Sequence, residues 1–201
     1  MRLTIIDYKA GNVASVVKAF EHLGAETHVT DDANEIATAE TLILPGVGHF
    51  SATRALNSLR TSILSRIESG VPFLGICVGM QWLYQGSAEC PETPGIGLLR
   101  GTVERFPKSV KSPHVGWNTV THTANPSRLL PTSDESFAYF THSYRCPVTP
   151  DTTGITEHGG TFAASIELAN IFGVQFHVEK SGDTGLAILR NFVNIAAAHA
   201  H

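Results

Sequence analysis

The chain has 201 residues and a formal net charge of −4, with 42% hydrophobic and 16% charged residues. This composition is typical of a folded globular protein, and we expect one domain spanning residues 1–201. No basic run occurs, so we expect neither nucleic acid nor an anionic membrane surface as a partner. No apolar run is long enough to cross a membrane, and the three cysteines lack metal-ligand spacing. We therefore expect a cytoplasmic protein with reduced thiols and no metal or cofactor.

Strands and helices are predicted to alternate through the first half of the chain. The sequence predicts four strands, at residues 3–7, 25–30, 41–44 and 71–76, and the first is expected to be buried and parallel. Apolar residues at helical spacing predict helices at residues 13–23 and 51–70, and residues 31–38 are expected to form a short helix or a turn. Asn12 is placed to cap the first helix, Pro45 is expected to end the third strand, and Ala55 is expected on the buried face of the last helix. The alternation predicts an α/β fold with a mostly parallel, doubly wound sheet and flanking helices.

The second half is predicted to be rich in antiparallel β-structure. Short β-rich segments, prolines and polar loops follow one another from Gly95 to Pro150, including 101–106 and 137–140. Residues 155–176 are typical of a series of hairpins, and apolar spacing over residues 183–198 predicts a closing helix.

The most informative stretch is Gly75-Ile76-Cys77-Val78-Gly79, in which two glycines flank a cysteine between a predicted strand and a helix. This is the pattern of the nucleophile elbow of hydrolases, with sulfur in place of the hydroxyl. The glycines leave room for backbone to pass close to the turn. A cysteine at a helix N-terminus lies near N–H groups whose partial positive charge favours the thiolate. A lone cysteine is more often a core residue than a nucleophile, so the assignment depends on the rest of the chain.

A cysteine nucleophile needs a base, and the base needs an acid that orients it. His177 and Glu179 follow a predicted strand, and two residues apart in extended backbone their side chains point to the same side. Glu179 then holds one ring nitrogen of His177 and leaves the other for Cys77. Backbone N–H groups of Val78 and of the glycine-rich turn 45–48 are the expected donors to a developing oxyanion.

Three segments resemble the three signatures of the class I glutamine amidotransferases, in the same order along the chain. They are Pro45-Gly46-Val47-Gly48, Gly75-Ile76-Cys77-Val78-Gly79-Met80-Gln81 and Phe176-His177-Val178-Glu179-Lys180-Ser181. Further segments resemble one branch of this family, the glutaminase subunits of imidazole glycerol phosphate synthases. They are Asp7-Tyr8 with Gly11-Asn12, residues 113–118, residues 139–145 and residues 185–192. The resemblance implies the flavodoxin-like fold of the class I amidotransferases.

The resemblance also implies a reaction and a role for each matching residue. Cys77 attacks the side-chain amide of L-glutamine, releases ammonia and leaves a γ-glutamyl thioester that water hydrolyses to L-glutamate. His177 transfers the proton, Glu179 orients His177, and the amides of Val47 and Val78 form the oxyanion hole. Substrate contacts are implied for Gly48, Gln81, Thr141, His142, Ser143 and Tyr144. Ammonia passes to a separate cyclase subunit, the partner in a heterodimer, for histidine biosynthesis.

The sequence departs from the family pattern at two positions. Val178 stands between His177 and Glu179, where the family commonly has proline, and valine tolerates the extended segment that the triad needs. Lys9 stands where the family often has glycine, so we expect a turn that avoids positive φ at this residue. Trp117 is expected either to face the synthase or to be an ordinary core aromatic.

Two alternatives remain open. A glutaminase that feeds another acceptor, such as pyridoxal phosphate or a nucleotide precursor, has the same triad, but the matches at 113–118 and 139–145 argue against it. A non-catalytic regulatory homologue keeps the fold without the chemistry, and the presence of all three triad residues argues against it. The resemblance further predicts low activity in the isolated chain, because such subunits often await a partner that completes the oxyanion hole.

Overall fold

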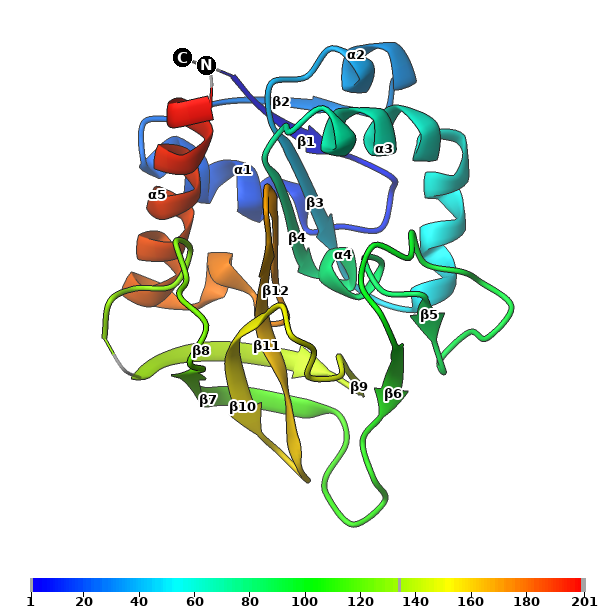
Figure 1. Ribbon diagram of the computed structural model, residues 1–201, viewed down its shortest axis with the longest axis vertical. Coiled ribbons are helices and arrows are strands. Elements are labelled where there is room, and N and C mark those ends of the chain that lie inside the picture. The colour runs from blue at the N-terminus through cyan, green and yellow to red at the C-terminus, as the bar shows by residue number, and fades with distance from the viewer. Residues whose placement is uncertain (1, 134, 200–201) are drawn as a thin grey trace.

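The computed structural model describes residues 2–133 and 135–199, which form two sheets and their flanking helices (Figure 1). The strands are β1 (Arg2–Ile6), β2 (Glu26–Thr30), β3 (Leu42–Gly46), β4 (Phe73–Cys77), β5 (Gly86–Ser87), β6 (Thr102–Arg105), β7 (His114–His122), β8 (Glu135–His142), β9 (Tyr144–Arg145), β10 (Thr152–Glu157), β11 (Thr161–Leu168) and β12 (Ile171–Val174). The α-helices are α1 (Val13–His22), α2 (Ala33–Ala37), α3 (Arg60–Glu68), α4 (Val78–Gln81) and α5 (Gly182–His199), and the 3₁₀ helices are η1 (Phe50–Ser58) and η2 (Val178–Lys180).

The larger sheet is parallel in one half and antiparallel in the other, as predicted. Its order is β2-β1-β3-β4-β12-β11-β10-β7-β8, and a smaller sheet has the order β5-β6-β9. The first five strands of that order run parallel, and pairing is antiparallel from β12 to β8. In Figure 1, α1 and α5 cover one face of the parallel half and α3 covers the other, which is a doubly wound arrangement. Because β12 pairs with β4, the segment after β12 lies beside the turn after β4.

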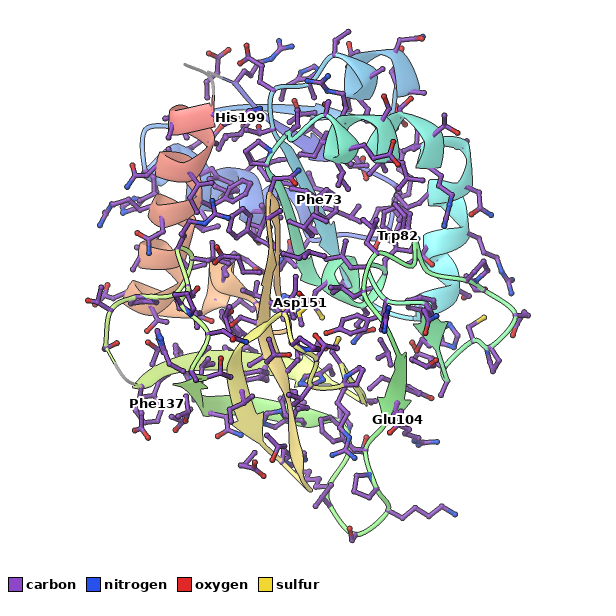
Figure 2. All side chains as sticks on the ribbon, in the orientation of Figure 1. Phe73, Trp82, Glu104, Phe137, Asp151 and His199 are labelled. Carbon is purple, nitrogen blue, oxygen red and sulfur yellow. The ribbon has the colours of Figure 1, made fainter. Side chains whose placement is uncertain are left out.

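The core is built from apolar side chains of both halves. Phe73 and Trp82 are buried in the interior, whereas Phe137 lies at the outer edge of the sheet and is 60% exposed (Figure 2). Burying a side chain of this size stabilises a fold by about 1.5–3 kcal/mol. Among the residues that the structure describes, no helix has the length and apolar character needed to span a bilayer.

Strand β3 continues through Pro45 and Gly46, so the prediction that Pro45 ends this strand was wrong. The Leu42 N–H donates to Pro72 on the β4 side, and N–H groups alternate sides along a strand, so the Pro45 nitrogen faces β1. On that side the paired positions of β3 extend only to Ile43. The missing N–H of proline therefore breaks no ladder bond.

The helix predicted over residues 51–70 is two helices, η1 and α3. From the start of η1 to the residue that follows it, every third residue is buried: Phe50, Thr53, Leu56 and Leu59. A 3₁₀ helix has three residues per turn, so these positions share one face. Ala55, which a regular α-helical period places inward, is exposed instead, and this prediction was wrong.

The turn after β1 has a positive φ of 65° at Lys9, contrary to the expectation from the sequence. The Lys9 N–H donates to Asp7 Oδ1 at 2.9 Å, and its ammonium group pairs with Asp7 at 2.9 Å and Asp31 at 3.1 Å. A left-handed conformation costs a residue with a Cβ roughly 1–2 kcal/mol. The local hydrogen bond and the two exposed ion pairs offset part of this cost.

Candidate active site

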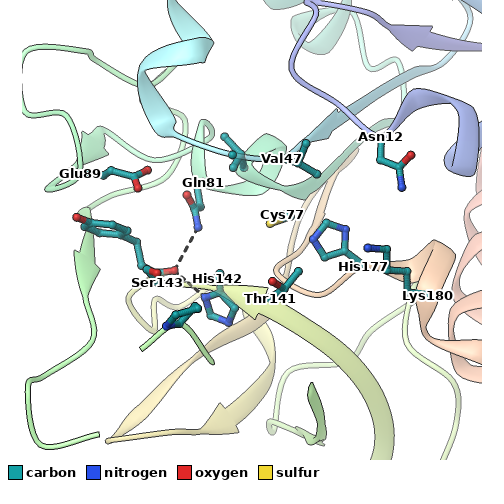
Figure 3. A pocket seen from close by; sticks show the side chains of 14 residues that line it. Asn12, Val47, Cys77, Gln81, Glu89, Thr141, His142, Ser143, His177 and Lys180 are labelled. Carbon is teal, nitrogen blue, oxygen red and sulfur yellow. Dashed lines mark hydrogen bonds between the residues drawn. The ribbon is translucent and has the colours of Figure 1, made fainter. Parts of the chain in front are cut away.

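A cavity of about 520 Å³ lies at the ends of β3, β4 and β8 and contains the predicted nucleophile (Figure 3). Ten of the eleven predicted site residues line it: Val47, Gly48, Cys77, Val78, Gln81, Thr141, His142, Ser143, Tyr144 and His177. The eleventh, Glu179, is bonded to His177 on the side away from the cavity. Four further residues line it: Asn12, Glu89, Pro113 and Lys180. The cavity therefore collects segments from both halves of the chain.

Cys77 ends β4 and directly precedes α4, at a strand–turn–helix junction. Its backbone has φ 53° and ψ −109°, a conformation that residues with a Cβ rarely adopt. A Cβ at Gly79 would lie 1.9 Å from the Leu44 carbonyl oxygen, and a Cβ at Gly75 would lie 2.7 Å from the Gly79 carbonyl. The two glycines therefore let α4 pack directly on β3 and β4, and this packing holds the strained cysteine in place.

His177 Nδ1 lies 2.9 Å from Glu179 Oε1, and the two side chains are 3% and 1% exposed. The route to this contact differs from the prediction, because β12 ends at Val174 and Glu179 lies in η2 rather than in extended backbone. The turn of η2, not the alternation of a strand, brings the carboxylate to the imidazole. Val178 begins η2, a position where proline is common because its fixed φ suits a helix start, and the buried valine fills it here.

The His177 imidazole is held in its charged form. Burial opposes the charge, but the Cys77 sulfur and the Glu179 carboxylate outweigh burial and raise the pKa of His177 to about 10. Since Glu179 occupies Nδ1, the other nitrogen, Nε2, is the one that faces Cys77. A charged imidazole between a sulfur and a carboxylate stabilises a thiolate and has a proton to give to a leaving group.

The two predicted oxyanion donors, the N–H groups of Val47 and Val78, differ in whether they already have a hydrogen-bond acceptor. The Val47 N–H donates to the Ala10 carbonyl at 2.9 Å, so it is engaged outside the cavity. Val78 opens α4, and N–H groups in the first turn of a helix have no acceptor within the helix. Gly48, next to Val47, has φ 84°, a conformation that glycine adopts at little cost and leaves easily.

A chain of buried amides connects the predicted substrate segment to the nucleophile. The Tyr144 carbonyl accepts from His142 Nδ1 at 2.7 Å and from Gln81 Nε2 at 3.2 Å. Gln81 Nε2 also donates to Gln175 Oε1 at 3.2 Å, and Gln175 Nε2 donates to Cys77 Sγ at 3.7 Å. Sequence reasoning missed Gln175. Its signal was available, since an amide side chain at the end of an otherwise apolar strand needs buried partners.

Two cavity residues have roles that the sequence did not reveal. Glu89 is half-buried and accepts from the Phe50 N–H at 2.7 Å, and it is the one carboxylate among the lining residues. It lies in an irregular turn outside the recognised motifs, so no pattern marked it. Asn12 occupies the N-cap position of α1, as predicted, but its side chain makes no capping hydrogen bond. It lines the cavity instead.

Comparisons with known proteins identify the family of this chain. The family model for class-I glutamine amidotransferases matches residues 4–196. The imidazole glycerol phosphate synthase subunit HisH of Methanothermobacter thermautotrophicus is 43% identical over 198 residues, covering 98% of this chain and 100% of that protein. HisH of Methanosarcina acetivorans is 46% identical over 199 residues, covering 96% and 98%. A crystal structure of a glutamine amidotransferase, 17% identical, superposes with a TM-score of 0.76 over 97% of this chain and 99% of that one, which shows a shared fold. The chain therefore belongs to the class I glutamine amidotransferases, in the branch of the HisH subunits of imidazole glycerol phosphate synthase.

Proposed function

We propose that this chain is a glutaminase in which Cys77, His177 and Glu179 form the catalytic triad. The observation that carries the proposal is the strained Cys77 at a strand–helix junction, facing an imidazole that a buried carboxylate orients at 2.9 Å. The Cys77 sulfur attacks the amide carbon of L-glutamine, and the C–N bond breaks as His177 protonates the amide nitrogen, which leaves as ammonia. Water, deprotonated by the now neutral His177, then attacks the γ-glutamyl thioester, releases L-glutamate and restores the thiolate beside the charged imidazole.

The cavity offers complementary groups to the two charges of the glutamine backbone. The Glu89 carboxylate and the amide oxygen of Gln81 suit the α-ammonium group, since both Gln81 hydrogen bonds to the protein are made by its nitrogen. Residues 141–144 and Gly48 also line the cavity, and we assign them to contacts with the α-carboxylate and the side-chain amide. These contacts would place the scissile amide against Cys77.

The isolated chain is expected to turn over slowly. A tetrahedral intermediate needs donors aimed at its oxygen, and loss of one such donor costs about 10²–10³ in kcat. In this conformation the Val47 N–H is bonded to Ala10 and must turn toward the cavity before it can serve. A partner that favours the turned peptide would raise the rate by completing the oxyanion hole.

The proposed partner is the cyclase subunit of an imidazole glycerol phosphate synthase, which receives the ammonia for histidine biosynthesis. A docking face adjoins the cavity on β7 and β8, where Val115 and Trp117 are 56% and 57% exposed. Val115 pairs with Thr141, which lines the cavity, and Trp117 pairs with Tyr139. The Lys180 ammonium, at the cavity wall, lies 5.9 Å from the Tyr139 ring centre. Exposed aromatic and aliphatic side chains beside a cavity are typical of an interaction surface.

The test is ammonia release from glutamine by the chain alone and with a cyclase subunit plus its nucleotide substrate. Cys77→Ala is the inactive variant, and Cys90→Ala is its matched control, because Cys90 is also buried but does not line the cavity. We expect strong stimulation by the cyclase, abolished by Cys77→Ala and kept by Cys90→Ala. Hydrolysis indifferent to the cyclase would contradict the partner, and point to another acceptor such as pyridoxal phosphate. No hydrolysis in either condition would favour a non-catalytic homologue.

A further inference from the structure

Two histidines behind the proposed substrate segment form a hydrogen-bonded pair between β7 and β8. His114 and His142 face each other in the strand register and are 6% and 7% exposed. His114 Nδ1 lies 3.3 Å from His142 Nε2. At the outer end Asn118 Nδ2 lies 3.1 Å from His114 Nε2, and at the inner end His142 Nδ1 lies 2.7 Å from the Tyr144 carbonyl oxygen. The four groups form one continuous chain.

The two ends of this chain determine where each proton lies. A carbonyl oxygen only accepts, so His142 carries its proton on Nδ1 and its Nε2 accepts from His114. The Asn118 amide nitrogen only donates, so His114 Nε2 accepts from it. The orientation of the Asn118 amide is set by two other bonds that do not involve His114. Asn118 Oδ1 accepts from the Thr119 N–H at 2.8 Å, and Nδ2 also donates to the Glu157 carbonyl at 3.1 Å. Every donor therefore points toward the substrate segment, which requires two neutral rings.

The surroundings favour neutral rings. The ring centre of Phe106 lies 5.1 Å from His142, and that of Phe140 lies 4.9 Å from His114 in a stacked arrangement. Burial lowers the pKa of His142 to about 3, assisted by the neighbouring His114 and opposed by the bond to the Tyr144 carbonyl, and burial together with His158 lowers the pKa of His114 to about 4. Among the described residues, no group of three or more His, Cys, Asp or Glu side chains is arranged to hold a metal ion. The pair is thus built to keep one proton arrangement.

We propose that His114 and His142 are positioning residues for glutamine, which act by holding the Tyr144 carbonyl where it orients the Gln81 amide. The Tyr144 carbonyl takes one Gln81 hydrogen at 3.2 Å and Gln175 takes the other at 3.2 Å, which leaves the Gln81 oxygen for the substrate. Without His142 the carbonyl loses its shorter bond, and the Gln81 amide loses its fixed orientation. This inference rests on the proposed glutaminase function.

The kinetic test uses the complex with cyclase and its nucleotide substrate. We expect His142→Phe, which keeps the ring but loses both hydrogen bonds, to raise KM for glutamine about tenfold and to change kcat less than about threefold. His142→Asn keeps an amide donor near the Nδ1 position and is expected to recover most of the loss. The matched control is His158→Phe. His158 stacks on His114 at 4.3 Å, but it bonds to the Lys111 carbonyl and takes no part in the hydrogen bonds that join Asn118, His114, His142 and Tyr144. An unchanged KM in His142→Phe, or an equal rise in His158→Phe, would overturn the proposal.

A second measurement does not depend on activity or on the folding of a variant. In the wild-type chain, nitrogen-15 NMR at neutral pH is expected to show a neutral His142 ring protonated on Nδ1. A His142 ring protonated on Nε2, or on both nitrogens, would overturn the proposed series of hydrogen bonds even if the kinetics agreed. If the wild-type complex hydrolyses no glutamine, the proposed function fails, and positioning for glutamine fails with it. The NMR result then still decides whether the proton-ordered pair exists.

Discussion

The close packing at the nucleophile predicts a large effect of Gly79→Ala. The added Cβ would lie 1.9 Å from the Leu44 carbonyl oxygen and 3.0 Å from its carbonyl carbon. A real Cβ contact is essentially never closer than 3.0 Å, so α4 and β3 must separate by about 1 Å or more. Both atoms belong to backbone, and no side-chain rotation relieves the contact. Overpacking usually costs about 1–3 kcal/mol, and we expect the upper end of this range or more, with loss of the Cys77 geometry.

Urea unfolding followed by tryptophan fluorescence measures this cost. Trp82 directly follows α4 and is 1% exposed, so its emission reports on the packing of this segment. Gly86→Ala is the matched control, because a Cβ there meets nothing closer than 3.6 Å and Gly86 has no positive φ. We expect Gly79→Ala to lower the free energy of unfolding by about 3 kcal/mol, which corresponds to roughly 6–12 °C in Tm for a chain of this size. A loss below about 1 kcal/mol, equal to that of Gly86→Ala, would refute the close approach.

Two further predictions concern buried polar groups. Burial lowers the pKa of His142 to about 3, so between that value and about pH 6.5 only the unfolded chain binds this proton. The His142 ring alone should therefore lower stability by roughly 2 kcal/mol as the pH falls from about 7 to 5, and His114, whose pKa is lowered to about 4, adds a similar loss. In urea unfolding the fall should be smaller by roughly 2 kcal/mol in His142→Phe than in wild type, and an equally steep fall in the two would contradict this. The Tyr8 hydroxyl is buried without a hydrogen-bond partner among the described residues, and burial raises the pKa of Tyr8. We expect Tyr8→Phe to match wild type or gain up to about 1 kcal/mol, measured by thermal unfolding, and a loss above about 1 kcal/mol would reveal a partner.

Features that depend on neighbours in the sequence were predictable. The two glycines around Cys77 predicted a strand, a tight turn and a helix, because the pattern describes local crowding that any such turn must satisfy. Apolar periodicity predicted the alternating first half and the antiparallel second half for the same reason. The predictions at Pro45, Ala55 and Lys9 failed because contacts with other parts of the fold contribute there. Pro45 lies beyond the positions of β3 that pair with β1, Ala55 lies in a helix of 3₁₀ period, and the ion pair with Asp31 helps to offset the cost of positive φ at Lys9.

By itself, the sequence determined the residue types at the site and the order of the motifs that carry them. It did not determine the contacts that depend on segments far apart in the chain. His114 meets His142 only because the register of β7 and β8 pairs them, and Gln175 reaches Cys77 only because β12 lies beside β4. The orientation of the Val47 peptide was likewise decided by the Ala10 carbonyl. A peptide N–H turns toward whichever acceptor the fold brings near, and that acceptor is chosen by packing rather than by the neighbouring residues.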